Sequence, residues 1–350
     1  MRIGVGLGSQ LGLPFEELVA LAGPATELRF DSVWTPKRTM PDSFHICLRW
    51  FEESVRHRPE GIGVGIGVLP APQQWHPASL ASQAATVATA TGGRFVLGIG
   101  TGGYGPAFWK HLGLPDKPIA VMRDYLDILR TAFRGEPVDY EGRVLRVRDF
   151  VLDQAPPAVP VYLGALGPQM LRLAGRCADG VLMNWASPAA IAAANDAVAE
   201  GAAAAGRRRG EVSLAMYLRC VVDEDVDAAR RVIAAEVLQK LRPSRRRGTQ
   251  PALGYRGQFA RLGFEGAILA IEERFAAGAS VTDLLDDVPA DMCAAAGYFG
   301  TAADAPARVA ELTRGLDEVV IRIVTTRPGI EPIVATMEAL APARLRAAGA

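Results

Sequence analysis

Residues 92–102 read GGRFVLGIGTG and are the most informative stretch of the chain. The apolar run Phe95–Ile99 is typical of a short buried strand, and it leads into Gly100-Thr101-Gly102, whose glycines let bare backbone approach a ligand. A second stretch has the same pattern, because Val161–Leu163 precedes Gly164-Ala165-Leu166-Gly167 and then a helical run. Since the N-terminus of a helix favours anions, the two loops predict a phosphate-bearing cofactor bound where strands end.

The first stretch also fits the pattern Gly-x-Gly-x-x-Gly at Gly98, Gly100 and Gly103, which binds dinucleotides in Rossmann folds. That fold needs a helix directly after the loop and an acidic residue at the end of the next strand. Here the loop continues with Tyr104-Gly105-Pro106, and the acid at the required spacing, Asp124, lies in a helical pattern. The sequence therefore disfavours a dinucleotide-binding unit.

The composition is that of an ordinary globular protein of 350 residues, 49% hydrophobic and 22% charged, with no formal net charge. This balance gives no support to nucleic-acid binding, and no apolar run is long enough to cross a bilayer. The chain enters its first strand without a signal-peptide pattern, which predicts a cytoplasmic protein. Its cysteines and histidines show no metal-ligand spacing, so we expect no metal. Only four of the 38 basic residues are lysines, which is typical of GC-rich genomes such as those of actinobacteria.

Eight short apolar strands alternate with helices along the chain. The expected strands are Arg2–Gly8, Ser32–Pro36, Gly61–Val68, Arg94–Gly100, Val159–Leu163, Gly180–Asn184, Ser213–Val222 and Glu318–Val324. This order predicts an α/β fold, a (β/α)8 TIM barrel, whose active site lies at the carboxyl ends of its strands. We expect one domain over residues 1–350 with insertions after strands 4 and 7, the second at about residues 225–300 and partly irregular. A hairpin over Val138–Val147 is expected before strand 5.

In several places the chain resembles the bacterial luciferase-like monooxygenase superfamily, and within it the branch that uses the deazaflavin coenzyme F420. The matching pieces follow the family's order and are Phe30–Trp34, Gly65–Pro70, Trp75-His76-Pro77, Gly92–Gly102, Met122–Tyr125, Val161–Pro168, Ala178–Val181 and Asp317–Val320. The resemblance implies an F420-dependent oxidoreductase. The alternative is a flavin monooxygenase that uses FMNH2 and O2, and a third hypothesis is a binding subunit that has lost the cofactor.

The resemblance also assigns roles to residues. It implies a bulge at Gly67 and Val68, often with a non-proline cis peptide bond, that supports the flavin ring. It implies that Gly100, Thr101 and Gly102 lie beside the ring and its side chain. It implies further that the loop after strand 5 binds the phosphate, through Gly164, Ala165, Leu166 and Gly167. Each glycine taken singly also fits an ordinary turn.

The chain departs from the family's sugar-phosphate dehydrogenases, which carry an Asp-His pair after strand 2 and a Glu after Gly-Thr-Gly. The corresponding residues here are Lys37, Arg38 and Gly103. Alcohol oxidation needs a general base, and neither cation serves readily, since Arg stays protonated. We expect Lys37 and Arg38 to be catalytic toward a polarised or anionic C=C or C=N acceptor, with Lys37 as proton donor. The alternative is that both face solvent on a loop.

Three expectations concern the surroundings of the site. His76 precedes Pro77 at a helix start and fits a capping residue better than an acid–base group. Six aromatic residues are expected near the barrel mouth, as a substrate wall or as packing: Trp34, Trp75, Tyr104, Phe108, Trp109 and Trp185. The acidic tail that F420 carries beyond its phosphate is expected to meet Arg256 and Arg261, helped by the basic run Arg242–Arg247.

The expected partners are a small-molecule substrate and, in a homodimer, a second copy of the chain.

Overall fold

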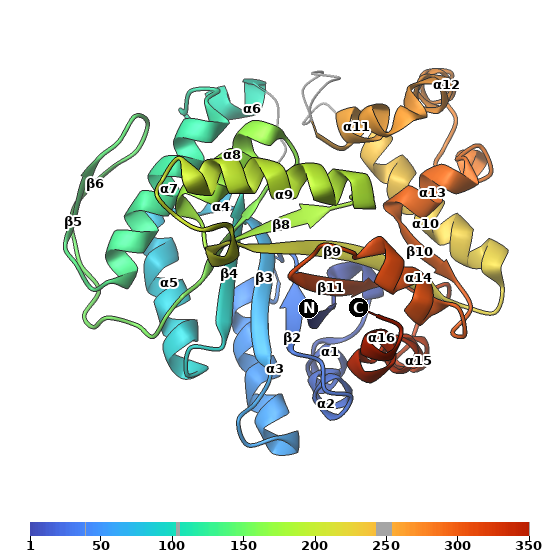
Figure 1. The fold of residues 1–350 in the computed structure, drawn as a ribbon, viewed down its shortest axis with the longest axis horizontal. Coiled ribbons are helices and arrows are strands. Elements are labelled where there is room, and N and C mark those ends of the chain that lie inside the picture. The colour runs from blue at the N-terminus through green and yellow to red at the C-terminus, as the bar shows by residue number, and fades with distance from the viewer. Residues whose placement is uncertain (39, 103–105, 243–253, 350) are drawn as a thin grey trace.

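The computed structural model describes residues 1–38, 40–102, 106–242 and 254–349. Eight parallel strands follow one another around a barrel, which closes where the last of them pairs with the first (Figure 1). In barrel order these strands are β1 Arg2–Gly6, β2 Ser32–Thr35, β3 Gly63–Pro70, β4 Phe95–Gly100, β7 Val161–Gly164, β8 Gly180–Asn184, β9 Ser213–Val222 and β11 Glu318–Ile323. The predicted TIM barrel is confirmed.

Helices follow the strands and cover the barrel from outside. They are α1 Phe15–Ala20, α2 Ala22–Glu27, α3 Ser43–His57, α4 Ala71–Gln74, α5 Pro77–Ala90, α7 Pro118–Phe133, α8 Pro168–Cys177, α9 Pro188–Ala203, α15 Glu331–Ala339 and α16 Pro342–Ala347, with short helical turns at η1 Ser9–Leu11 and η2 Arg209–Glu211. Local capping residues fix where several begin: the Asp42 carboxylate accepts the N–H groups of Phe44 and His45 at the start of α3. His76 accepts the Ala78 N–H at 3.3 Å, which confirms its capping role at α5.

Both predicted insertions are present. The loop after β4 contains α6 (Pro106–His111), and an antiparallel hairpin of β5 (Val138–Glu141) and β6 (Arg146–Phe150) precedes β7. The insertion after β9 comprises α10 Val226–Leu241, α11 Gly254–Phe259, η3 Ala260–Phe264, α12 Glu265–Ala276, η4 Thr282–Leu284, α13 Ala290–Ala296, β10 Gly297–Gly300 and α14 Ala305–Leu312. It is more regular than expected, because it is mostly helical and its strand β10 extends the sheet beside β9. Figure 1 shows the hairpin and the helices α11–α13 at opposite edges of the molecule.

The amino-terminal end of the barrel interior is closed by a charged network. Arg2 donates to the hydroxyl of Tyr162 at 2.6 Å and pairs with Glu318 at 2.8 Å, while Tyr162 donates to Glu318 at 3.1 Å. Burial raises the pKa of the Glu318 carboxyl even though Arg2 lies beside it. Farther along the interior the Tyr217 ring takes the space next to Gly67, where a Cβ would lie 2.9 Å from it. The interior is therefore a packed core, and a ligand has access at the carboxyl ends of the strands.

Three aspartates join neighbouring strands at this closed end in the same way. Each stands directly before a strand, donates its N–H to a carbonyl of the preceding barrel strand, and accepts that residue's N–H with its carboxylate. The pairs are Asp31 with Ile3, Asp179 with Val161, and Asp317 with Leu214, with N–H to carboxylate distances of 2.7, 2.8 and 2.8 Å. These Asp-mediated strand pairs explain why the sequence repeats an Asp two residues before a strand valine.

Asp179→Ala is expected to lower the free energy of unfolding by about 1–3 kcal/mol, because the Val161 N–H loses its partner in a buried strand. Urea unfolding followed by circular dichroism measures this. Asp196→Ala, at an exposed position of α9, is the matched control and should unfold like the unaltered protein. Equal stability of the two variants would contradict the role given to Asp179.

Candidate functional site at the barrel mouth

The sequence-predicted site residues come together at one end of the barrel. They follow or end four neighbouring strands, and parallel strands bring their carboxyl ends to the same edge. These residues are Lys37 and Arg38 after β2, Gly67 and Val68 in β3, Gly100, Thr101 and Gly102 at the end of β4, and Gly164, Ala165, Leu166 and Gly167 at the end of β7. Their placement at one mouth makes this the candidate site.

The bulge predicted in β3 is present. The pairing of β3 with β4 shifts between Ile66 and Leu69, and the Gly67-Val68 peptide bond is cis. The Val68 side chain packs against bare backbone of the next two strands: a Cβ at Gly100 would lie 3.0 Å from it, and one at Gly164 would lie 3.2 Å from it. Close packing against Val68 therefore favours glycine at both positions.

Gly167 differs from the other loop glycines. It is the N-cap of α8, where no side chain caps the helix, and its φ of −100° suits any residue. A Cβ at this position would meet no protein atom within 4 Å. The N–H groups of the first turn and the helix dipole favour an anion here, and bare backbone lets it approach closely. Ala165 is buried and Leu166 is half-buried, so we expect these two residues to contribute through their backbone.

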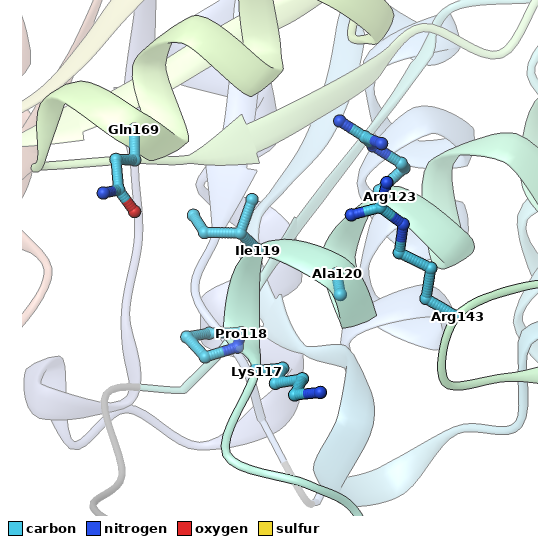
Figure 2. A pocket seen from close by; sticks show the side chains of 7 residues that line it. All are labelled: Lys117, Pro118, Ile119, Ala120, Arg123, Arg143 and Gln169. Atoms are coloured by element: carbon cyan, nitrogen blue, oxygen red, sulfur yellow. The ribbon is translucent and has the colours of Figure 1, made fainter.

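A pocket of about 360 Å³ lies beside the start of α8. It is lined by the start of α7, the turn of the hairpin and the first turn of α8, through Lys117, Pro118, Ile119, Ala120, Arg123, Arg143 and Gln169. Figure 2 shows the side chains of Arg123 and Arg143 extending close to each other from α7 and from the hairpin. No lining residue is acidic, and within the described ranges neither arginine forms a salt bridge. The pocket, called the basic pocket below, is therefore suited to an anion.

The hairpin turn that carries Arg143 is fixed by Asp124, which is 1% exposed. Its carboxylate accepts the N–H groups of Val144 and Leu145, both at 2.8 Å, and the hydroxyl of Tyr140 at 3.0 Å. Asp124, which does not fit the dinucleotide-binding pattern, therefore has a structural role. It holds the hairpin turn against α7, so that Arg143 lines the same pocket as Arg123.

The loop after β2 presents two half-buried cations, Lys37 and Arg38. Ser43 fixes the loop, because its Oγ accepts the Arg38 N–H at 2.9 Å and donates to the Pro36 carbonyl at 3.2 Å. Burial lowers the pKa of the Arg38 guanidinium, and its buried Nε and Nη1 have no hydrogen-bond partner among the described residues. A ligand oxygen would satisfy these donors. The catalytic role of the pair stays a prediction.

A second group of cations, missed by the sequence analysis, lies on β9 and β11. Arg219 is 1% exposed, donates to Glu236 at 2.8 Å and to Asn184 at 2.6 Å, and lies over the Trp185 ring at 4.3 Å. Burial lowers the pKa of Arg219 to about 10. Burial acts to raise the pKa of Glu236, but Arg322 and Arg219 outweigh it and hold that pKa below its ordinary value. Because Glu236 belongs to α10, this network ties the insertion to the barrel.

For three of the six aromatic residues expected near the mouth, the structure supports the packing alternative. Trp34, Trp109 and Trp185 are at most 2% exposed and serve packing; the Trp34 ring, for example, donates to Ser32 Oγ at 2.8 Å. Trp75 is half-buried, and the side chains of Tyr104 and Phe108 lie outside the described residues.

The prediction that Arg256 of the insertion meets the acidic tail of the cofactor is wrong. Its guanidinium pairs with Glu272 at 2.7 Å and with Glu265 at 3.1 Å, so its charge is neutralised within the insertion. Arg261 also has an interaction partner, and Arg245–Arg247 lie outside the described residues. In the part of the chain that the structure describes, no helix could span a membrane and no group of three or more His, Cys, Asp and Glu residues could hold a metal.

Comparisons with known proteins point to one family. The family model described as luciferase-like monooxygenase matches residues 1–318. The 5,10-methylenetetrahydromethanopterin reductase of Archaeoglobus fulgidus is 35% identical over 181 residues. The match covers 51% of this chain and 54% of that protein, so it spans about half the length of this relative. The F420-dependent glucose-6-phosphate dehydrogenase of Nakamurella multipartita is 30% identical over 247 residues, 68% of this chain and 73% of the relative. The structure of the coenzyme F420 dependent tetrahydromethanopterin reductase from Methanopyrus kandleri has a TM-score of 0.75 at 23% identity over 97% of both chains, which shows a shared fold.

Proposed function

Because the chain belongs to the luciferase-like monooxygenase family, we propose that it is an oxidoreductase that transfers hydride between reduced coenzyme F420 and a C=C or C=N bond of a small-molecule substrate. The name of the F420-dependent glucose-6-phosphate dehydrogenase relative supports F420 as the cofactor. The observation that carries the proposal is the start of α8, where no side chain caps the helix at Gly167 and where Gln169 of the first turn lines the same basic pocket as Arg123.

The residues at the mouth fit a phosphate-bearing deazaflavin. The backbone of Gly164–Gly167 and the Arg123 guanidinium would bind the phosphate, and Gly67-Val68 with Gly100–Gly102 would support the ring. When bound, the deazaflavin supplies hydride from a ring carbon and reacts poorly with oxygen. The protein contributes position and charge.

The substrate end of the site is cationic. The unused donors of Arg38 would bind an oxygen of the acceptor and stabilise the negative charge that develops when hydride arrives. Lys37 would then give a proton from Nζ to the atom next to the reduced carbon, so that hydride and proton together saturate the bond. Because neither cationic side chain serves readily as a general base, reduction of the acceptor is favoured over oxidation of an alcohol.

Arg123→Ala is expected to weaken F420 binding about fivefold, close to 1 kcal/mol, because a charged donor to the phosphate is lost while the backbone donors remain. Quenching of F420 fluorescence during titration into the purified protein measures the dissociation constant. Arg148→Ala, an exposed hairpin arginine paired with Glu141, is the matched control and should bind normally. The same dissociation constant for both variants would remove Arg123 from the site.

The cofactor itself is tested by titrating F420 and FMN separately into the protein. We expect reduced F420 to bind and to be oxidised by an unsaturated acceptor without uptake of oxygen. Oxygen uptake coupled to oxidation of FMNH2, with no binding of F420, would establish the monooxygenase alternative. Binding of neither flavin would favour a role as a binding subunit.

A further inference from the structure

A second hollow continues from the basic pocket along the outer face of α8. It measures about 320 Å³ and shares Ile119, Arg123 and Gln169 with the basic pocket. Its remaining lining comes from farther along α8 and from α9, which pack against each other. We call this second hollow the α8 groove. It leads away from the phosphate loop and from the barrel mouth.

Polar and basic residues of α8 follow one another along the groove. Gln169 lies in the first turn, Arg172 about one turn later and Arg176 in the last turn, so a regular spacing of three to four residues puts them on one face. At a rise of 1.5 Å per residue, this row extends roughly 10 Å from the start of the helix. A chain of negative charges that begins at the α8 N-terminus would meet these residues in order.

The charge of the groove is positive despite one carboxylate. Arg172 pairs with Glu200 of α9 at 2.6 Å, which neutralises part of its charge. Among the described residues Arg176 and Arg123 form no salt bridge. The Arg176 side chain is exposed, and an unpaired exposed guanidinium is available to a carboxylate from outside.

We propose that the α8 groove binds the acidic tail of the cofactor, a chain of γ-linked glutamates. The proposal rests on the function proposed above, since it starts from a phosphate bound at Gly167. Arg176 binds a tail carboxylate, Arg123 serves both the phosphate and the first tail carboxylate, and Glu200 opposes the tail by its charge. FMN ends at its phosphate, so the groove also discriminates between the two cofactors.

The test measures dissociation constants for F420 preparations that differ only in the number of glutamates, including a form with none. For the unaltered protein the dissociation constant should fall roughly three- to tenfold from the form without glutamate to the longest form, and this difference should shrink as salt is raised. Arg176→Glu should abolish the difference while leaving the affinity for the form without glutamate unchanged. Glu200→Gln should enlarge it.

Arg208→Ala is the control for overall charge, because Arg208 is exposed and pairs with Glu211 outside the groove. If all forms of F420 bind equally well and Arg176→Glu changes nothing, the tail lies elsewhere and the proposed function stands. If no form binds, the proposed function fails with it. If Arg176→Glu does not fold, Glu200→Gln still tests whether the groove binds the tail, because it should enlarge the difference in dissociation constant between the forms of F420.

Discussion

Lys37→Ala is expected to lower the turnover number about 100-fold with substrate saturating, while the affinity for F420 stays nearly unchanged. The magnitude is that of losing a positioned proton donor. Lys37 follows β2 at the mouth, on a loop that Ser43 holds in place, so removing its side chain leaves the phosphate site untouched. Steady-state kinetics with reduced F420, together with a fluorescence titration, separate the two quantities.

Two further variants make this result interpretable. Lys37→Arg keeps the charge but gives up its proton far less readily, so it should restore substrate affinity and not turnover if Lys37 is the donor. Recovery of both would assign Lys37 to anchoring. Arg56→Ala, at the exposed end of α3, controls for the loss of one positive charge. If Lys37→Ala has the same turnover number as this control, Lys37 has no catalytic role and is a solvent-facing loop residue.

Gly167→Val is expected to weaken F420 binding tenfold or more, about 1.4 kcal/mol, because the valine side chain would stand where the phosphate approaches the backbone. The structure makes this substitution unusually informative. A Cβ at Gly167 meets no protein atom and the φ angle is ordinary, so the fold itself has no reason to resist it. Equilibrium titration with F420 measures the effect.

Gly210→Val is the matched control, since a Cβ at Gly210 also lies in open space and this glycine precedes β9 at the opposite end of the barrel. Both variants should unfold at nearly the same denaturant concentration. Unchanged F420 affinity in a folded Gly167→Val protein would rule out the phosphate loop and remove the main support for the proposed function.

The sequence predicted the barrel because its signal is local. The strands are short apolar runs that alternate with helical patterns, and β8 and β9 have the bounds expected from the sequence alone. The prediction of a bulge at Gly67-Val68 came from the family resemblance. The strand β10 could not be expected in the same way, since Gly297–Gly300 is too short and too rich in glycine to stand out.

The basic pocket was missed because its cations come from separate segments. Arg123 stands on α7 between the buried residues Met122 and Asp124, and Arg143 reaches the same pocket because Asp124 binds the hairpin turn. No spacing in the sequence indicates that these two residues share a pocket. Arg219 and Arg322 did carry a signal, since a basic residue at an inward position of an apolar strand needs a buried partner. Glu236, the partner they share, lies on the insertion.

The Asp-mediated strand pairs have a consequence for how such a protein can change over generations. They hold neighbouring strands together at the end of the barrel opposite to the mouth, so the frame does not depend on what the mouth loops contain. A lineage can exchange those loops, and with them the substrate, while the strands keep their register. If the catalytic prediction for Lys37 and Arg38 is correct, this pair on the loop after β2 is such an exchange.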